Sequence, residues 1–357
     1  MKFTSICVIG LGYIGLPTAS TFATHGMKVF GMDSNAEVVR SLQNGHVHIF
    51  EPGLQQLVTQ ALSSGKLQVS DKVTPADAFI IAVPTPFYAD KKADMRFVTS
   101  AAESIVPALR EGNLVVLEST SPPQTTRNLV LPILEKSGLK AGTDFLLAYS
   151  PERVLPGQIM RELIENARVI GGINRASAEA GRDLYATFVK GEIVLTDSTT
   201  SEMVKLMENT YRDINIAAAN EFSRLADRFG VDVWEAIQIA NLHPRVKILN
   251  PGPGVGGHCI SVDPWFFVES APDITPLILA ARKVNDSQPE FAARLVERAL
   301  HESNAKKIAC LGLSFKPDVD DLRESPALDV VKLIAGQGVD VSYFEPFKPD
   351  FEVEGAR

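Results

Sequence analysis

The sequence predicts an α/β fold in which a doubly wound parallel sheet comes first, a mostly helical domain follows, and a smaller α/β domain comes last. Over the first half of the chain, short runs of β-branched and apolar residues alternate with helical stretches, a pattern that indicates a parallel sheet. No Pro or Gly then occurs between Ser198 and Gly230, which indicates one long helix. A last strand–helix–strand pattern begins at Lys307.

The predicted strands of the first domain are short and are separated by helical segments. The first strand covers residues 5–10 and ends in a glycine-rich turn, after which a helical pattern runs through Ala23. The second strand covers residues 28–32 and leads directly to Asp33. Further strands are predicted at residues 78–83, 114–118 and 145–148.

The long helix is predicted from the spacing of its apolar residues, which recur at roughly helical intervals from Met203 to Phe229. Thr199 and Glu202 resemble a capping box, which would begin the helix, and Gly230 would end it. Such a helix can offer an apolar face to a second copy of the chain. We therefore predict a homodimer or a larger homo-oligomer that assembles through this helix.

The remainder of the chain is predicted to add helices and a single βαβ unit. Residues 250–257 form a Pro/Gly loop, and the pattern over residues 274–302 is helical. The βαβ unit consists of a strand, a helix and a strand at residues 307–311, 326–336 and 339–344. These patterns predict three domains, which cover residues 1–197, 198–300 and 301–357.

The composition is that of an ordinary soluble globular protein. Apolar residues make up 45% of the 357 residues and charged residues 22%. The net charge of −8 argues against nucleic-acid and anionic-membrane partners. Cys7, Cys259 and Cys310 show no paired spacing and no HExxH or CxxC motif occurs, so neither disulfides nor a metal site is predicted. Since no stretch of about 18 apolar residues occurs either, we predict a cytoplasmic protein.

A glycine-rich turn near the N-terminus predicts a nucleotide cofactor. Gly10, Gly12 and Gly15 follow the first strand and open a helix, and Asp33 ends the second strand. The glycines would admit a pyrophosphate to the helix N-terminus, and the acid would accept a ribose 2′-hydroxyl. An acid at this position repels a 2′-phosphate, which favours NAD over NADP. A tight turn without any ligand is the alternative, and the context argues against it. We therefore predict a Rossmann-type domain that binds NAD.

Two further loops follow predicted strands of the same sheet. They are residues 83–86, which include Thr85, and residues 118–122, which include Thr120. Ligands of open α/β sheets bind outside the carboxyl ends of the strands. Each loop by itself could be an ordinary connection between two elements. Together with the glycine-rich turn, the two loops are predicted to line the cofactor crevice.

A cysteine after a run of glycines predicts covalent chemistry. Cys259 follows Gly254, Gly256 and Gly257, and Asp263 lies one helical turn beyond the thiol. An enzyme that moves a single hydride needs no nucleophilic thiol, so the combination with an NAD site suggests an oxidation through a carbon–sulfur intermediate. A buried, inert thiol is the alternative for Cys259.

Lys205 and Asn209 are spaced i, i+4 on the long helix, so they share one of its faces. For an arbitrary pair of this kind, a solvated helix face is the more common explanation. By themselves these two residues indicate little.

The motifs named so far occur together in one family. The segments GLGYIGLP, VPTP, SPER, EMVKLMEN, GVGGHC and GLSFKPDVDDLRESP appear here in the order in which they appear in the UDP-glucose/GDP-mannose dehydrogenases. The chain resembles that family over essentially its whole length. The resemblance implies that NAD⁺ oxidises the C6 alcohol of a nucleotide sugar twice, giving a uronic acid. Cys259 would capture the aldehyde as a thiohemiacetal, which becomes a thioester and is then hydrolysed.

The resemblance also implies roles for individual residues. Lys205 corresponds to a lysine that transfers a proton or stabilises the C6 oxyanion, and Asn209 is the neutral donor beside it. Asp263 would assist proton movement, Glu152 would be the general base for hydrolysis, and Thr120 would position water or the nicotinamide. Positions that match cofactor contacts are Gly10, Gly12, Tyr13, Ile14, Gly15, Asp33, Thr85, Thr120 and Arg323. Positions that match substrate contacts are Arg153, Val154, Lys205, Asn209, Arg212, His243, Arg245, Gly256, Phe315 and Lys316.

Four segments resemble the family members that oxidise UDP-N-acetyl-D-mannosamine, namely HIFEPGL, YSPERVLPG, NLHPRV and PGPGVGGHCISVDPWF. The residues around Ser261 and those at 155–157 depart from the pattern of the UDP-glucose members. The turn at residues 120–125 lacks the Gly-Thr ending that is commoner in the family, so we expect a modest loop change there. UDP-N-acetylglucosamine and UDP-N-acetylgalactosamine remain alternative substrates.

Family members also continue beyond the position at which this sequence ends, so the third domain is expected to be a partial Rossmann-like unit with weakened UDP binding, whether the chain is naturally short or truncated. For that reason, a non-catalytic nucleotide-sugar-binding protein remains a further alternative.

Overall fold

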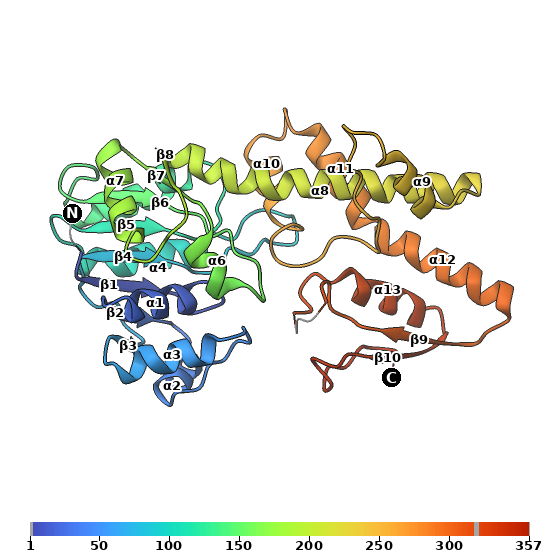
Figure 1. Cartoon of the computed structure of the whole chain (residues 1–357), viewed down its shortest axis with the longest axis horizontal. Helices are drawn as coiled ribbons and strands as arrows, with labels where there is room; N and C mark the ends of the chain where they lie inside the picture. Colours follow the sequence, from blue (N-terminus) through green and yellow to red (C-terminus); the bar gives the residue numbers. More distant parts are fainter. Residues whose placement is uncertain (1–2, 318–320, 357) are drawn as a thin grey trace. The chain divides into compact units, whose positions relative to one another are not determined.

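A computed structural model describes residues 3–317 and 321–356. Asp318, Val319 and Asp320 of the GLSFKPDVDDLRESP segment lie outside the described residues. The chain divides into two compact units, which we call the first unit (Met1–Leu206) and the second unit (Met207–Arg357). Figure 1 labels the elements of both.

The first unit is built on one eight-stranded sheet in the order β3-β2-β1-β4-β5-β6-β7-β8 (Figure 1). Neighbouring strands are parallel except for β6 and β7. The strands are β1 Ser5–Ile9, β2 Lys28–Met32, β3 Leu67–Ser70, β4 Ala78–Ile81, β5 Leu114–Leu117, β6 Leu146–Tyr149, β7 Arg168–Gly172 and β8 Ile193–Asp197. The predicted α/β class is confirmed, and β3, β7 and β8 are strands that the sequence patterns had not indicated.

Helices cover both faces of this sheet, because successive side chains of a strand point to opposite faces. Ile6 and Val8 of β1 belong to one hydrophobic cluster, and Cys7 and Ile9 belong to the other. Burial raises the pKa of Cys7 to about 11, which fits an inert thiol. The helices are α1 Gly15–Thr24, α2 Ala36–Gln43, α3 Leu54–Ser63, α4 Arg96–Ile105, α5 Leu131–Leu134, α6 Ile159–Glu165 and α7 Arg175–Tyr185. Single turns of other helix types cover Val106–Ala108, Thr126–Val130 and Glu135–Ser137.

The long helix α8 runs from Ser198 to Phe229, as its spacing predicts. The expected capping box at its start is wrong. Asp197 occupies the capping position, since its carboxylate accepts bonds from the backbone and hydroxyl of Thr200 at 3.0 and 2.6 Å. Glu202 instead turns to Gln124 and Thr126, where three donors satisfy its buried carboxylate.

The second unit combines the rest of α8 with shorter helices and a small sheet. Its helices are α9 Val233–Ala240, α10 Asp263–Ser270, α11 Pro276–Asp286, α12 Gln288–Ser303 and α13 Pro326–Ala335. The predicted helix over residues 274–302 is two helices, because the chain leaves helical geometry at Ser287, and α12 begins at Gln288 with Pro289 in its first turn. Strands β9 Lys307–Leu311 and β10 Asp340–Phe344 are parallel and pack on α13. Cys310 is half-buried in that cluster.

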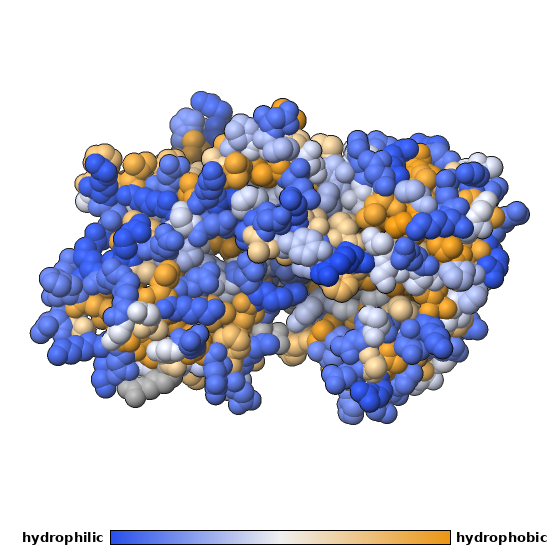
Figure 2. Space-filling model, turned by 180° about the vertical axis from the view of Figure 1, so that it is seen from behind, coloured by the Kyte–Doolittle hydropathy of each residue, from blue (hydrophilic) through white to orange (hydrophobic). Residues whose placement is uncertain are grey.

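Among the described residues, no helix is both long enough and apolar enough to cross a membrane. Hydrophobic and hydrophilic side chains are interspersed over the side of the molecule that Figure 2 shows.

Candidate active site

The glycine-rich turn between β1 and α1 has the geometry of a nucleotide cradle. Gly10 adopts φ +93°, and a Cβ there would lie 2.6 Å from the carbonyl oxygen of Ala82. A Cβ at Gly15 would lie 1.8 Å from the carbonyl oxygen of Gly10, so the helix can begin this close only at glycine. A Cβ at Gly12 would meet open space. Gly10 and Gly15 therefore shape the turn, and Gly12 leaves room for a ligand to approach the backbone.

Charge and hydrogen bonding around this turn fit NAD. Among the described residues, α1 has neither a side-chain cap at Ile14 nor an acidic residue in its first turn, so its N-terminus is suited to a pyrophosphate. Asp33 follows β2, and its carboxylate accepts bonds from the backbone of Leu11 and Asn35 at 2.9 and 2.8 Å. The acid is thereby fixed beside the turn, where it would accept a ribose hydroxyl.

His48 is a further residue at this turn, and no sequence motif pointed to it. Burial lowers the pKa of His48, while the charge of Asp33 and a bond to the backbone of Leu11 oppose that shift. The imidazole of His48 therefore lies close to Asp33 and to the glycine-rich turn.

The two loops that follow β4 and β5 are joined by hydrogen bonds. The hydroxyl of Ser119 donates to the carbonyl of Val83 at 2.7 Å, and the hydroxyl of Ser121 donates to the carbonyl of Ser119 at 2.9 Å. Thr85 and Thr120 are both half-buried on these loops. The structure thus brings both predicted threonines to the carboxyl end of the sheet, where the cofactor turn also lies.

The turn after Thr120 contains an uncommon backbone conformation. Gln124 has φ +71°, in the left-handed region that glycine adopts freely and other residues adopt at a cost of about 1 kcal/mol. The carboxylate of Glu202 accepts a bond from the backbone of Gln124 at 2.6 Å and stabilises this conformation. A glutamine therefore occupies a left-handed position of the kind that glycine usually fills.

Glu152 lies in a buried cluster of charges that includes a second carboxylate. The guanidinium of Arg168, from β7, donates to Glu152 at 2.5 Å and to Glu118 at 3.1 Å. It also donates to the hydroxyl of Ser150 at 3.1 Å, and the hydroxyl of Tyr185 donates to Glu118 at 2.9 Å. The guanidinium carbon lies 4.2 Å from the ring centroid of Tyr185. We call these five residues the first-unit acid cluster.

Glu118 is the carboxylate of this cluster whose pKa is clearly raised. Burial raises its pKa to about 7, the charge of Glu152 adds to that rise, and Arg168 opposes it. Among the described residues, its Oε2 atom has no hydrogen-bond partner. Glu118 was predicted as the junction of the strand at residues 114–118 and the loop at residues 118–122, and Arg168 was not predicted as a site residue because the patterns did not indicate β7. The one available signal was an acid placed at the carboxyl end of a fully buried strand.

The loop after Glu152 carries two of the predicted substrate contacts. Arg153 is half-buried and donates to the carbonyl of Ala167 at 3.2 Å. Val154 packs against the hydrophobic cluster that contains Ile6. The buried carboxylate of Glu51 accepts bonds from the backbone of Gly157 and Ile159, both at 2.8 Å. Glu51, which belongs to the HIFEPGL segment, therefore fixes this loop at the start of α6.

In the second unit, the loop that carries Cys259 packs tightly against the segment before α13. A Cβ at Gly256 would lie 2.5 Å from the Cβ of Phe315, and one at Gly257 would lie 2.8 Å from the Phe315 ring. Gly256 and Gly257 therefore allow this loop to pack directly against Phe315. Two predicted substrate residues, Gly256 and Phe315, are thereby brought together, and Cys259 is half-buried beside them.

The residues around the thiol are linked to the long helix. Asp263 begins α10, its backbone N–H donates to the carbonyl of Cys259 at 2.8 Å, and its buried carboxylate accepts a bond from the Asn209 amide at 2.6 Å. Asn209 and Lys205 are both buried along α8. The solvated helix face that would explain an arbitrary Lys/Asn pair therefore does not apply here.

Arg323 forms an ion pair with Asp321, which also belongs to the second unit. Its guanidinium donates to Asp321 at 2.6 and 2.8 Å and interacts with the imidazole of His258 at 3.0 Å. The carbonyl of Arg323 accepts a bond from the backbone of Gly257 at 3.1 Å. Lys316, which precedes Arg323 in the same segment of the sequence, is half-buried. The predicted cofactor contact Arg323 is therefore also a neighbour of the thiol loop.

The remaining predicted substrate residues lie at the surface. Arg212, His243 and Arg245 are exposed on the second unit, and the backbone of Arg245 donates to the His243 ring at 3.3 Å. Within this unit, they do not share the buried setting of Asn209 and Asp263.

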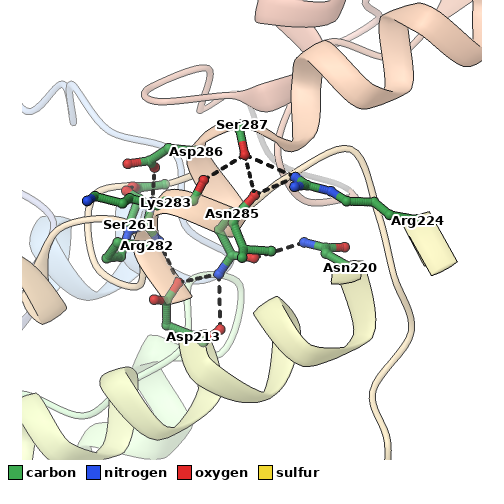
Figure 3. A network of polar contacts seen from close by, with 11 residues as sticks. Asp213, Asn220, Arg224, Ser261, Arg282, Lys283, Asn285, Asp286 and Ser287 are labelled. Carbon is green, nitrogen blue, oxygen red and sulfur yellow. Dashed lines mark hydrogen bonds and ion pairs between the residues drawn. The ribbon is translucent and has the colours of Figure 1, made fainter. Parts of the chain in front are cut away.

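A buried polar network connects α8, α11 and the loop before the thiol (Figure 3). Arg282 donates to Asp213 at 2.5 Å and also contacts Asp286. The amide of Asn285 donates to the Asp213 carboxylate at 2.8 Å. Asn220 donates to Asn285 and accepts from the backbone of Gly252, both at 2.9 Å. We call this the second-unit network, and it anchors the chain just before the thiol loop.

Three models of one family match the chain. They are the NAD binding, central and UDP binding domains of the UDP-glucose/GDP-mannose dehydrogenase family, at residues 4–189, 199–287 and 309–357.

Individual relatives are similar over almost the whole chain. A UDP-N-acetyl-D-mannosamine dehydrogenase of Methanococcus maripaludis is 51% identical over 97% of this chain and 81% of its own length. An NDP-N-acetyl-D-galactosaminuronic acid dehydrogenase of Ralstonia solanacearum is 48% identical over 94% of this chain and 81% of its own. The solved structure of a UDP-D-ManNAc dehydrogenase from Pyrococcus horikoshii has a TM-score of 0.91 and 45% identity, covering 99% of this chain and 84% of its own.

Proposed function

The chain belongs to the UDP-glucose/GDP-mannose dehydrogenase family, and we propose that it oxidises C6 of UDP-N-acetyl-D-mannosamine to the carboxylate. The observation that carries this proposal is the setting of Cys259. The carbonyl of Cys259 accepts a bond from the backbone of Asp263, the first residue of α10. The carboxylate of Asp263 accepts a bond from Asn209 on α8, and the same helix carries the buried Lys205. A thiol, an ammonium, an amide and a carboxylate are the groups that a thiol-dependent oxidation of an alcohol needs.

We propose that residues 1–197 bind the cofactor, residues 198–300 supply the thiol loop, and residues 301–357 contribute to binding of the nucleotide. NAD⁺ held at the glycine-rich turn would accept the hydride from C6 in each of two successive oxidations. Gly10, Gly12, Gly15 and Asp33 would hold the cofactor, with Tyr13, Ile14, Thr85, Thr120 and Arg323 as further contacts.

In the first oxidation, the protein must stabilise charge on the C6 oxygen. Lys205 would support the negative charge as the hydroxyl loses its proton, and Asn209 would donate a hydrogen bond to the same oxygen. The sulfur of Cys259 then adds to the aldehyde carbon to give a thiohemiacetal. This adduct retains the aldehyde and presents the remaining C–H bond for the second oxidation.

The second oxidation converts the thiohemiacetal to a thioester, which water must hydrolyse. Water attacks the carbonyl carbon, Glu152 takes a proton from it, and the carbon–sulfur bond breaks. The thiolate of Cys259 leaves and recovers a proton, so the products are a carboxylate and the free thiol. Asp263 would assist this proton movement beside Asn209.

The nucleotide sugar would be held by side chains that suit a diphosphate and an acetamido sugar. Arg153, Arg212, Arg245 and Lys316 supply positive charge, and Arg can bond phosphate oxygens in pairs. Further contacts would come from Val154, His243, Gly256 and Phe315. The name of the Methanococcus relative supports UDP-N-acetyl-D-mannosamine, and that of the Ralstonia relative favours a galactosamine-derived sugar as the second candidate.

Product stoichiometry tests the reaction. Incubation with UDP-N-acetyl-D-mannosamine and excess NAD⁺ should yield two NADH for each sugar consumed, together with the uronate. One NADH with a free aldehyde would exclude the thioester step. Turnover of UDP-N-acetylgalactosamine alone would reassign the sugar, and no turnover of any nucleotide sugar would favour a binding protein.

The Cys259→Ser variant tests the nucleophile. We expect it to bind sugar and NAD⁺ with nearly unchanged affinity and to stop uronate release, because a hydroxyl is a weaker nucleophile than a thiolate and forms no thioester. Calorimetry and uronate analysis measure these two properties. Undiminished uronate production by the serine variant would refute the role of Cys259.

We also propose that the protein is a cytoplasmic homodimer that assembles through α8 and α9. A groove of about 340 Å³ between these helices is lined by Phe222, Leu225, Phe229, Val233, Ile237 and other apolar residues. Phe229, Trp234 and Leu242 are exposed at or beside it. Apolar surface of this kind is typical of interfaces between copies of a chain. Sedimentation should give a dimer for the wild type and a monomer for Phe229→Glu, and a monomeric wild type would refute the proposal.

A further inference from the structure

We propose that Glu118 is a positioning residue for thioester hydrolysis, which acts by sharing Arg168 with the general base Glu152. This inference rests on the proposed function and adds a second carboxylate to its last step. Glu118 lies at the carboxyl end of β5, directly before the loop that carries Thr120. Its side chain would touch neither substrate nor cofactor, so its influence must pass through Arg168.

The geometry of the first-unit acid cluster supports a shared arginine. The side chains of Glu118, Arg168 and Glu152 are 0%, 5% and 8% exposed. One terminal nitrogen of Arg168 donates to Glu118 and the other to Glu152. Because Arg168 is planar and held from both sides, a change in the charge of one carboxylate alters its attraction for the other.

The charges of the cluster do not cancel. Within the cluster two carboxylates face one guanidinium, and its other two members, Ser150 and Tyr185, are neutral, as is the backbone N–H of Arg153 that donates to Glu152 at 2.7 Å. A buried site with an excess negative charge gains by holding one proton. Glu118 is the acid that takes up this proton, because burial raises its pKa to about 7. Near neutral pH, Glu118 therefore exchanges a proton while it shares Arg168 with Glu152.

The protonation of Glu118 sets how well Glu152 can accept a proton. When Glu118 is ionised, the positive charge of Arg168 is shared between two carboxylates. Arg168 then stabilises the anion of Glu152 less, so Glu152 takes a proton from the attacking water more readily. When Glu118 holds the proton, the full charge of Arg168 stabilises the anion of Glu152, which becomes a weaker base. Hydrolysis should therefore slow as pH falls and Glu118 takes up its proton.

Two variants separate this role from a structural one, because they shift the pH dependence in opposite directions. Glu118→Gln removes one negative charge, so the full charge of Arg168 acts on Glu152. The acidic limb of the hydrolysis rate should move down by about one pH unit, and the rate above pH 7 should fall severalfold. Tyr185→Phe removes a bond that favours ionised Glu118, so the acidic limb should move to higher pH.

The measurement is a single turnover with UDP-N-acetyl-D-mannosamine and excess NAD⁺ between pH 5 and 9. NADH formation reports the two oxidations, and quenched samples report the release of uronate. Both variants should form NADH at the wild-type rate and differ in uronate release alone. Glu179→Gln on α7, which has an exposed ion pair with Arg175, serves as a matched control and should behave as the wild type.

The outcomes distinguish this inference from the proposed function. A wild type that releases no uronate would overturn the proposed function and this inference with it. A wild type that releases uronate, with both variants keeping its acidic limb, would overturn the role of Glu118 alone. Melting temperatures identify a variant that fails to fold. If one variant fails, the direction in which the acidic limb of uronate release moves in the other variant tests the role of Glu118.

Discussion

Each unit of the molecule buries one arginine between two carboxylates. In the first unit, Arg168 lies between Glu118 and Glu152, and in the second unit Arg282 lies between Asp213 and Asp286. Both arginines are at most 5% exposed, and in both clusters one carboxylate is fully buried. The clusters have the same charges and nearly the same arrangement.

They differ in the second carboxylate. Glu152 is 8% exposed, whereas Asp286 is 42% exposed, so water screens the charge of Asp286. In the second-unit network, Asp213 also accepts a bond from the neutral amide of Asn285. The burial of Glu152 makes the first-unit acid cluster suited to holding a proton for hydrolysis. The exposure of Asp286 leaves the second-unit network with a structural role as an anchor.

The largest expected effect is the loss of the arginine in the second unit. Arg282→Met should lower the free energy of unfolding by about 3–5 kcal/mol, because it leaves Asp213 as a buried charge without its partner. Urea unfolding measures the loss, and Arg175→Met, which breaks an exposed pair, should cost less than about 1 kcal/mol. Adding Asp213→Asn should recover much of the loss. If the double variant were as unstable as Arg282→Met, the unpaired charge would not be the cause.

The pH dependence of stability should differ between the clusters. The pKa of Glu118 rises from 4.5 to about 7 on folding. Between these values the folded state holds a proton that the unfolded state has released, so this contribution is fully present below pH 4.5 and is lost as pH rises through 7. The loss is up to about 3 kcal/mol.

Unfolding at pH 5 and pH 8 tests this expectation. From pH 5 to pH 8 the wild type should lose stability relative to Glu118→Gln, which has no carboxylate to titrate. Burial also raises the pKa of Asp213, but from 3.8, so the difference between wild type and Asp213→Asn should develop over a window that begins at lower pH. Parallel stability curves for wild type and Glu118→Gln would contradict the prediction.

A smaller effect is expected where the second-unit network meets the thiol loop. Asn220→Ala should cost about 1–3 kcal/mol, because it leaves the backbone of Gly252 and the amide oxygen of Asn285 without their bonds. It should also slow both oxidations, since the chain before Cys259 loses an anchor. Steady-state kinetics should show a lower kcat with an unchanged pH profile. A shifted acidic limb would mean that this network also takes part in proton transfer.

The smallest effect is expected at the edge of the same network. Ser287 accepts a bond from Arg224 at 3.1 Å and donates to the carbonyl of Lys283 at 2.6 Å. Ser287→Ala should lower the free energy of unfolding by about 1 kcal/mol, because the site is partly accessible to water. Thermal unfolding at one pH measures it. A loss as large as that of Asn220→Ala would show that bonds at the edge matter as much as those in the centre.

Much of the fold was predictable because it depends on local patterns. The strand ending at Gly10, the acid at Asp33 and the long helix ending before Gly230 all follow from residues close together in the chain. Strand β7 gave no clear signal, since it is short and ends in two glycines. The capping box failed because Glu202 is drawn to a loop about eighty residues earlier, a contact that no local pattern encodes.

The sequence by itself determined the family and predicted the cofactor turn and the reactive thiol, because these depend on short motifs with fixed spacing. Only the tertiary structure decided which acids share an arginine, because Glu118 and Arg168 are fifty residues apart and meet through the order of the strands. It also decided that the glycines before Cys259 serve packing against Phe315. Burial raises the pKa of Glu118, and close packing leaves no room for a side chain at Gly256 and Gly257. Both effects arise only when segments distant in the sequence pack together.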